Sequence, residues 1–251
     1  MMGSIEAALF IDGLWLLVGA VFLAGLARGF VGFGTAMIFM PFAATVLEPL
    51  VAVLTLLIFD LIGPLPILPR AVKDGELRDV FWLAGGALIG APFGLLVLMQ
   101  ISPDPFRWLV AAASLALLIL LMTGWRYRGR LSRAMIIVTG AIGGLLGGIA
   151  GMAGPPVISL YMASTKSAAV IRANIFLFLL LTDITVFVFV LLAGRFTLTP
   201  IILGLVLSLP YMLGNVLGQR LFDPAHERIF RQTAYALIAM AAIVNLPIWG
   251  L

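Results

Sequence analysis

Long apolar stretches separated by short polar turns run along the whole chain. Stretches of about 18 or more apolar residues are typical of membrane-spanning helices. Ten apolar segments, several of them shorter than a full span, lie at roughly 7–27, 33–47, 49–68, 80–100, 106–124, 133–150, 155–165, 170–193, 198–219 and 229–248. A short segment beside a glycine break is typical of a re-entrant hairpin buried in protein. The pattern predicts an all-α, polytopic integral membrane protein.

One glycine-rich run interrupts the apolar pattern in each half of the chain. Residues 28–35 read RGFVGFGT, and residues 147–156 read GGIAGMAGPP. Gly32 in the first run corresponds to Gly151 in the second at an offset of 119 residues. Paired glycine-broken segments in two halves indicate the binding site of a secondary transporter. A broken helix offers a ligand the free N–H groups and dipole end that a continuous helix lacks.

A second set of matches supports an internal repeat. The Gly-x-x-x-Gly pattern at 90–94 returns at 214–218, an offset of 124 residues. Five elements per half is an odd number, so the second half is expected to be inverted with respect to the first. We therefore predict a first inverted repeat over 1–125, a cytoplasmic basic connector over 126–132 and a second inverted repeat over 133–251.

The basic residues predict the orientation of the chain. With the N-terminus outside and the sides alternating, thirteen of the fifteen Lys and Arg residues lie in inner loops. These thirteen are Arg28, Arg70, Lys73, Arg78, Arg126, Arg128, Arg130, Arg133, Lys166, Arg172, Arg220, Arg228 and Arg231. The outer loops hold only Arg107 and Arg195. Because short cytoplasmic loops carry the excess of basic residues, the N-terminus is expected outside.

The composition excludes several kinds of functional site. The chain is 63% hydrophobic and only 10% charged. It has no Cys and a single His, His226, which excludes disulfides, thiolate sites and multi-histidine metal sites. The basic residues lie between apolar segments, so the basic balance does not indicate nucleic-acid binding. The sequence lacks the motifs of nucleotide binding and hydrolysis, so we expect neither an enzyme, a primary pump nor a cofactor.

Each glycine break is expected to end at the N-terminus of a helix, which is partially positive. Inverted symmetry would bring the two ends together near the membrane midplane, where they suit an anion. The predicted site residues here are Gly32, Gly34 and Thr35 in the first break and Gly151, Gly154 and Pro155 in the second. The alternative is that these glycines only allow close helix packing.

Three polar residues are further candidates for binding the anion. Arg28 directly precedes the first break, where it is either a deeply placed anion ligand or an inner-side topology charge. Arg172 and Asn174 open the eighth apolar segment. Arg172 could instead anchor its helix at the interface, and Asn174 could make an interhelical hydrogen bond.

Two carboxylates lie well inside apolar segments. Asp60 and Asp183 are candidates for coupling transport to an ion, because buried acids in membrane helices often move protons. The alternative for each is a structural ion pair with an arginine.

These motifs resemble those of the sulfite exporter TauE/SafE family, also called the TSUP transporters. The resemblance rests on the runs at 24–34 and 144–156 and on the two Gly-x-x-x-Gly helices, each followed by Phe-Arg. It covers nearly the whole chain. It implies export of sulfite, of sulfonates such as sulfoacetate, or of related small organic anions across the bacterial inner membrane.

We therefore expect a secondary transporter that exports a small sulfur-containing anion. Its expected partners are the anionic substrate and the lipid bilayer, and not nucleic acid; a coupling ion and a homodimer stay open. Two alternatives remain, namely uptake of another small organic anion and a membrane assembly or scaffold protein without transport. In a scaffold, the glycines should all face neighbouring helices.

Overall fold

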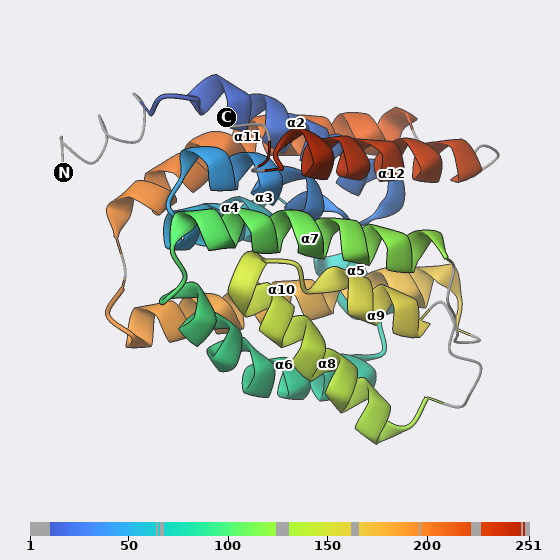
Figure 1. Cartoon of the computed structure of the whole chain (residues 1–251). Helices are drawn as coiled ribbons and strands as arrows, with labels where there is room; N and C mark the ends of the chain where they lie inside the picture. The colour runs from blue at the N-terminus through green and yellow to red at the C-terminus, as the bar shows by residue number, and fades with distance from the viewer. Residues whose placement is uncertain are drawn as a thin grey trace. The chain divides into compact units, whose positions relative to one another are not determined.

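A computed structural model of the chain describes residues 11–63, 65, 68–123, 131–161, 166–195, 197–221, 227–246 and 248. Within these ranges every regular element is a helix (Figure 1). The helices are α2 (Leu14–Val31), α3 (Thr35–Val46), α4 (Pro49–Ile62), α5 (Leu68–Asp74), α6 (Leu77–Leu98), α7 (Pro103–Met122), α8 (Arg133–Ala150), α9 (Gly154–Tyr161), α10 (Ala168–Leu192), α11 (Leu198–Leu221) and α12 (Glu227–Val244). The predicted all-α class is confirmed.

Five of these helices are long and apolar enough to cross a membrane, namely α6, α7, α8, α10 and α11. Shorter apolar helices accompany them, among them α3 and α4. The chain is thus a multi-pass membrane protein. The predicted segment 49–68 is not one helix, because α4 ends at Ile62 and a separate short α5 follows. The intervening sequence Gly-Pro-Leu-Pro explains the stop, since proline lacks a backbone N–H and disfavours helix before it.

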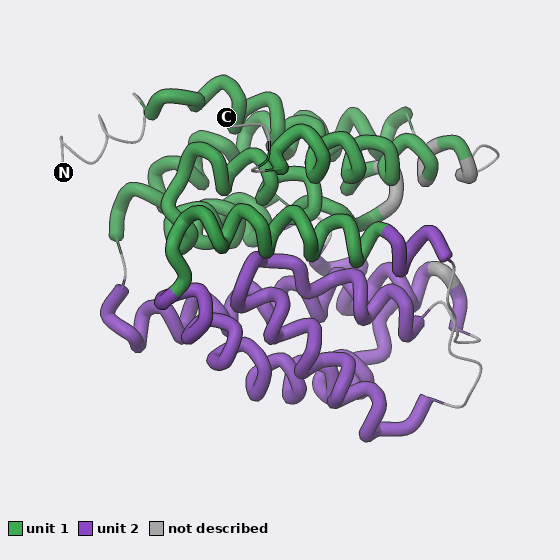
Figure 2. Tube along the Cα trace, in the orientation of Figure 1, with its two compact units in different colours: residues 1–63, 101–118, 196–251 green, residues 64–100, 119–195 purple. Residues whose placement is uncertain are grey.

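The helices form two compact units (Figure 2). Unit 1 comprises Met1–Gly63, Ile101–Leu118 and Phe196–Leu251, and unit 2 comprises Pro64–Gln100 and Ile119–Arg195. Unit 1 combines α2, α3 and α4 with α11 and α12, whereas unit 2 combines α8, α9 and α10 with α5 and α6. Each unit therefore takes helices from both halves of the sequence. The division into repeats over 1–125 and 133–251 and their inversion stay predictions, and residues 126–130 of the connector lie outside the described residues.

Each unit contains one closely packed helix pair. In unit 1, α2 packs along α11, and a Cβ added at Gly29 would lie 2.5 Å from the carbonyl oxygen of Asn215. In unit 2, α6 packs along α8, and a Cβ added at Gly148 would lie 2.5 Å from the carbonyl oxygen of Ala91. Such short distances leave no room for a side chain. Glycine at these positions lets the two backbones approach, as is common between membrane helices.

Candidate functional site

The first predicted break lies in unit 1, between α2 and α3. Helix α2 ends at Val31, and Gly32 follows in the left-handed conformation with φ 82°. Gly34, which precedes Thr35 at the start of α3, is also left-handed, with φ 100°. A Cβ at Gly34 would meet only a methyl group of Ile238 at 3.5 Å, an ordinary contact. Glycine is needed at this break for its backbone conformation and not for lack of space.

The second break lies in unit 2, between α8 and α9. Gly151 follows the last residue of α8 with φ 71°, and its N–H donates to the carbonyl of Gly147 at 2.8 Å. Helix α9 begins at Gly154, with Pro155 in its first turn, where proline is well tolerated. At both breaks the first helix ends at a left-handed glycine, which is exposed at Gly32 and half-buried at Gly151. The residues that begin the next helix, Thr35, Gly154 and Pro155, are buried.

The glycines of the two runs thus divide into two kinds. Gly29 and Gly148 allow neighbouring backbones to approach, which is the packing alternative. Gly32, Gly34 and Gly151 instead have positive φ and end or begin helices. The packing interpretation therefore holds at Gly29 and Gly148, whereas anion binding at Gly32, Gly34 and Gly151 stays a prediction.

Arg28, in the last turn of α2, is buried beside the first break. Only 8% of Arg28 and 7% of Asp60 is exposed. Arg28 Nη1 lies 3.3 Å from Asp60 Oδ2 in α4 and 3.5 Å from Thr35 Oγ1 at the start of α3. Three residues that the sequence singled out separately are thus brought together in unit 1.

Tyr211 of α11 completes this group. Its hydroxyl donates to Asp60 Oδ1 at 2.5 Å and lies 3.2 Å from Thr35 Oγ1. The tyrosine is fully buried, and its ring stands 5.0 Å from that of Phe59. The sequence pattern does not single it out, because a tyrosine fits the apolar pattern of a membrane helix and carries no separate signal. We call Arg28, Thr35, Asp60 and Tyr211 the Arg28 cluster.

The cationic and hydroxyl groups of the Arg28 cluster are of the kinds that bind oxyanions. A guanidinium presents N–H groups in a planar fork that matches carboxylate, sulfonate and related oxyanions. The hydroxyls of Thr35 and Tyr211 are additional hydrogen-bond donors. Burial makes each of these contacts stronger than in water and makes an unpaired charge costly.

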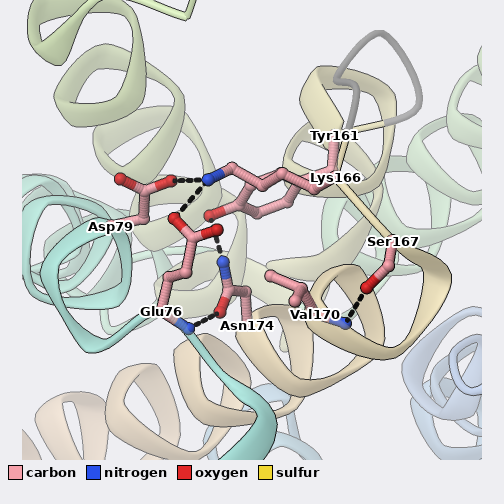
Figure 3. Close-up of polar contacts among 7 residues, drawn as sticks. All are labelled: Glu76, Asp79, Tyr161, Lys166, Ser167, Val170 and Asn174. Atoms are coloured by element: carbon pink, nitrogen blue, oxygen red, sulfur yellow. Dashed lines mark hydrogen bonds and ion pairs between the residues drawn. The ribbon is translucent and has the colours of Figure 1, made fainter.

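A second polar group lies in unit 2 (Figure 3). Asn174 of α10 is fully buried, and its side-chain oxygen accepts the backbone N–H of Glu76 at 2.8 Å. Its amide nitrogen donates to the hydroxyl of Tyr161 at 3.1 Å. Asn174 therefore makes the interhelical hydrogen bonds that were the alternative to anion binding.

Lys166 joins this group through two ion pairs. Its ammonium contacts Glu76 Oε2 and lies 3.0 Å from Asp79 Oδ2 (Figure 3). Burial alone would lower the pKa of Lys166, but hydrogen bonds and charge interactions with the two carboxylates outweigh it and raise that pKa. The lysine thus stays charged and ties the connection before α10 to the start of α6.

The remaining candidates lie on α10. Arg172 is exposed near the start of this helix. Asp183 is buried, and the neighbouring hydroxyls of Thr182 and Thr185 donate to carbonyls of their own helix. Anion binding by Arg172 and coupling by Asp183 stay predictions. Within the described residues, no three or more His, Cys, Asp or Glu side chains are placed to hold a metal ion.

Comparison with known proteins identifies the family. The model of the family described as sulfite exporter TauE/SafE matches residues 17–245. The chain therefore belongs to the sulfite exporter TauE/SafE family, a family of membrane transporters. No curated protein and no solved structure matches the chain. The resemblance seen in the glycine-rich runs is confirmed.

Proposed function

We propose that this TauE/SafE family member is a secondary transporter that exports a small sulfur-containing anion across the bacterial inner membrane. Sulfite, sulfoacetate and other sulfonates are the substrates that the family and the site chemistry favour. The observation that carries the proposal is the buried guanidinium of Arg28 beside the break between α2 and α3.

The first break supplies several groups suited to an anion. Arg28 provides the charge, and Thr35 provides a hydroxyl at the first residue of α3. Gly34 caps α3 without a side-chain hydrogen bond, so no cap side chain covers the partially positive helix end. We therefore propose that Arg28 and Thr35 bind the anion and that the anion reaches them past the backbone at Gly32 and Gly34.

The scaffold alternative fits the break less well. Glycines that serve only to pack helices contact neighbouring backbones, as Gly29 does. Gly32 is exposed, and the nearest atom to a Cβ at Gly34 is a side-chain methyl. A binding role for Gly151, Gly154 and Pro155 in unit 2 stays a prediction, as does a homodimer.

Replacement of Arg28 tests the proposal. We expect Arg28→Ala to weaken binding of sulfite or sulfoacetate to the purified protein by roughly tenfold to a hundredfold, because a hydrogen bond to a charged group contributes about 1.5–3 kcal/mol. Arg28→Lys should rescue binding only in part, since the planar fork is lost. Arg220→Ala is the matched control, because it removes one exposed arginine from the same unit.

A double variant controls for the stability that is lost when Arg28 alone is removed. Arg28→Ala leaves Asp60 buried without its cation, so the double variant Arg28→Gln with Asp60→Asn should be measured alongside it. Unchanged affinity in folded Arg28→Ala, or in the double variant compared with Asp60→Asn alone, would leave Arg28 only its structural ion pair with Asp60 and refute the site. Uptake of labelled anion by inside-out and right-side-out vesicles then distinguishes export from uptake.

A further inference from the structure

The Arg28 cluster already contains an anion. Asp60 Oδ2 lies 3.3 Å from Arg28 Nη1, which is the contact that an oxygen of a sulfonate would need. Asp60 Oδ1 accepts the hydroxyl hydrogen of Tyr211 at 2.5 Å. More than nine-tenths of both Arg28 and Asp60 is buried, so neither charge is compensated by bulk water.

Two anions cannot share this guanidinium at low cost. A buried charge is stable only when it is paired and hydrogen-bonded. A substrate that displaces Asp60 from Arg28 leaves the carboxylate buried beside a second negative charge, with only hydroxyl groups as donors. Under these conditions the neutral carboxylic acid is the more stable form of Asp60.

We infer that Asp60 is the resident anion of the Arg28 site and that each substrate anion binds together with one proton, which Asp60 takes up. The inference rests on the proposed function, because it assigns the coupling ion of the same site. The Arg28–Asp60 ion pair breaks, a solvent proton binds a carboxylate oxygen of Asp60, and the anion pairs with Arg28. For a monoanion such as isethionate, the cluster is neutral before and after this exchange.

The charged surroundings of Asp60 are few. Helix α2 carries only Arg28, α3 carries no charged residue, and α4 carries only Asp60 itself. Helix α11 contributes Tyr211 and Arg220, which lies nine positions further along. Nine residues of helix correspond to about 13 Å, so Arg28 and Tyr211 are the groups on these helices that face the carboxylate. On these four helices, Arg28 is therefore the charged side chain beside Asp60.

Proton and anion binding are then linked in both directions. Since linkage is reciprocal, a proton gradient moves the anion and an anion gradient moves protons in the same direction. Proteoliposomes loaded with a sulfonate should therefore lose protons from the lumen as the anion leaves. A lumenal pH indicator reports this movement.

The proton count can be measured on the native protein. Isethionate and sulfoacetate are suitable probes, because their sulfonate groups stay ionised throughout the neutral range, whereas sulfite itself titrates there. Titration calorimetry in two buffers of different ionisation enthalpy should give about one proton taken up per anion bound. As the pH rises, the affinity for the anion should fall roughly tenfold per pH unit in the range where the Arg28–Asp60 pair is fully ionised.

Replacement of Asp60 identifies the proton acceptor. Asp60→Asn cannot take up a proton and removes the competitor of the substrate. We expect its anion affinity to be independent of pH and at least tenfold higher than that of the native protein at the alkaline end. Asp183→Asn is the matched control, because it neutralises another buried carboxylate and should keep the uptake of one proton.

The outcomes separate this inference from the proposed function. Binding that depends on Arg28 but takes up no proton overturns the inference and leaves the anion site standing. Proton uptake that survives in folded Asp60→Asn overturns it as well, and its loss in Asp183→Asn would then identify Asp183 as the acceptor. Absence of sulfonate binding to the native protein at every pH overturns the proposed function and the inference together. The number of protons taken up per anion bound by the native protein tests the inference even if Asp60→Asn does not fold.

Discussion

At the residue scale, similar-looking glycines are required for different physical reasons. Gly29 has no room for a Cβ, which would lie 2.5 Å from a carbonyl oxygen. Gly34 has room for one, but its φ of 100° belongs to the region that side chains disfavour. A sequence shows both simply as glycine. The two roles of glycine, at a helix break and at a packing interface, can therefore be distinguished by the substitutions that each position tolerates.

Substitution at Gly34 should follow backbone preference and not size. We expect Gly34→Val to lower the free energy of unfolding by about 1–2 kcal/mol, because a β-branched residue is strained in the left-handed region. Gly34→Asn should cost clearly less, since asparagine tolerates that region. Thermal unfolding of the detergent-solubilised protein measures both, with Gly85→Ala, an open helical position, as the control. Equal losses for valine and asparagine would show that space, and not conformation, limits this position.

The residues of the Arg28 cluster could be predicted singly but not as a group. Arg28 and Asp60 are conspicuous as charges in or beside apolar segments, and Thr35 marks the restart of a helix. Their pairing depends on the way that α4 packs, because Asp60 follows Arg28 by 32 positions in a different helix. Tyr211 could not be found, since an apolar helix accepts a tyrosine without any break in its pattern.

At the element scale, each unit depends on one close helix pair. The α2–α11 pair of unit 1 and the α6–α8 pair of unit 2 both have glycine against backbone along their contact. The sequence predicted these glycines as repeat matches, and the breaks that follow them were located correctly. It did not predict that α2 pairs with α11, because the pairing of distant helices follows from the fit of their surfaces and not from either pattern alone.

Side chains at the packing glycines should destabilise the helix pairs. We expect Gly29→Ala and Gly148→Ala each to lower stability by about 1–3 kcal/mol, because overpacking a tight contact forces the backbones apart. Gly85→Ala, with no atom within 4 Å of the added Cβ, should be neutral or slightly stabilising. Midpoints of thermal unfolding and yields of purified protein provide the measurement. Wild-type midpoints for both packing variants would contradict the close approach of these helices.

At the scale of the whole molecule, the compact units do not follow the order of the chain. Helices α11 and α12 come last in the sequence, yet they belong to unit 1 with α2, α3 and α4. Hydrophobic patterning could predict the membrane class and most of the helices, because both depend on local composition. It could not predict this exchange of helices between units, because the partners of a helix are determined by long-range packing.

The orientation of the chain in the membrane is a prediction for the molecule as a whole. Because the sequence assigns twelve of the fifteen basic residues to cytoplasmic loops even when the buried Arg28 is left out, the connector over 126–132 should be inside. The chain has no native cysteine, so single cysteines can report on it. An impermeant maleimide should label Ser102→Cys, between α6 and α7, in intact spheroplasts, and Gly129→Cys only after the membrane is opened. Labelling of Gly129→Cys in intact spheroplasts would show that the Arg-rich connector is outside, which contradicts the predicted orientation.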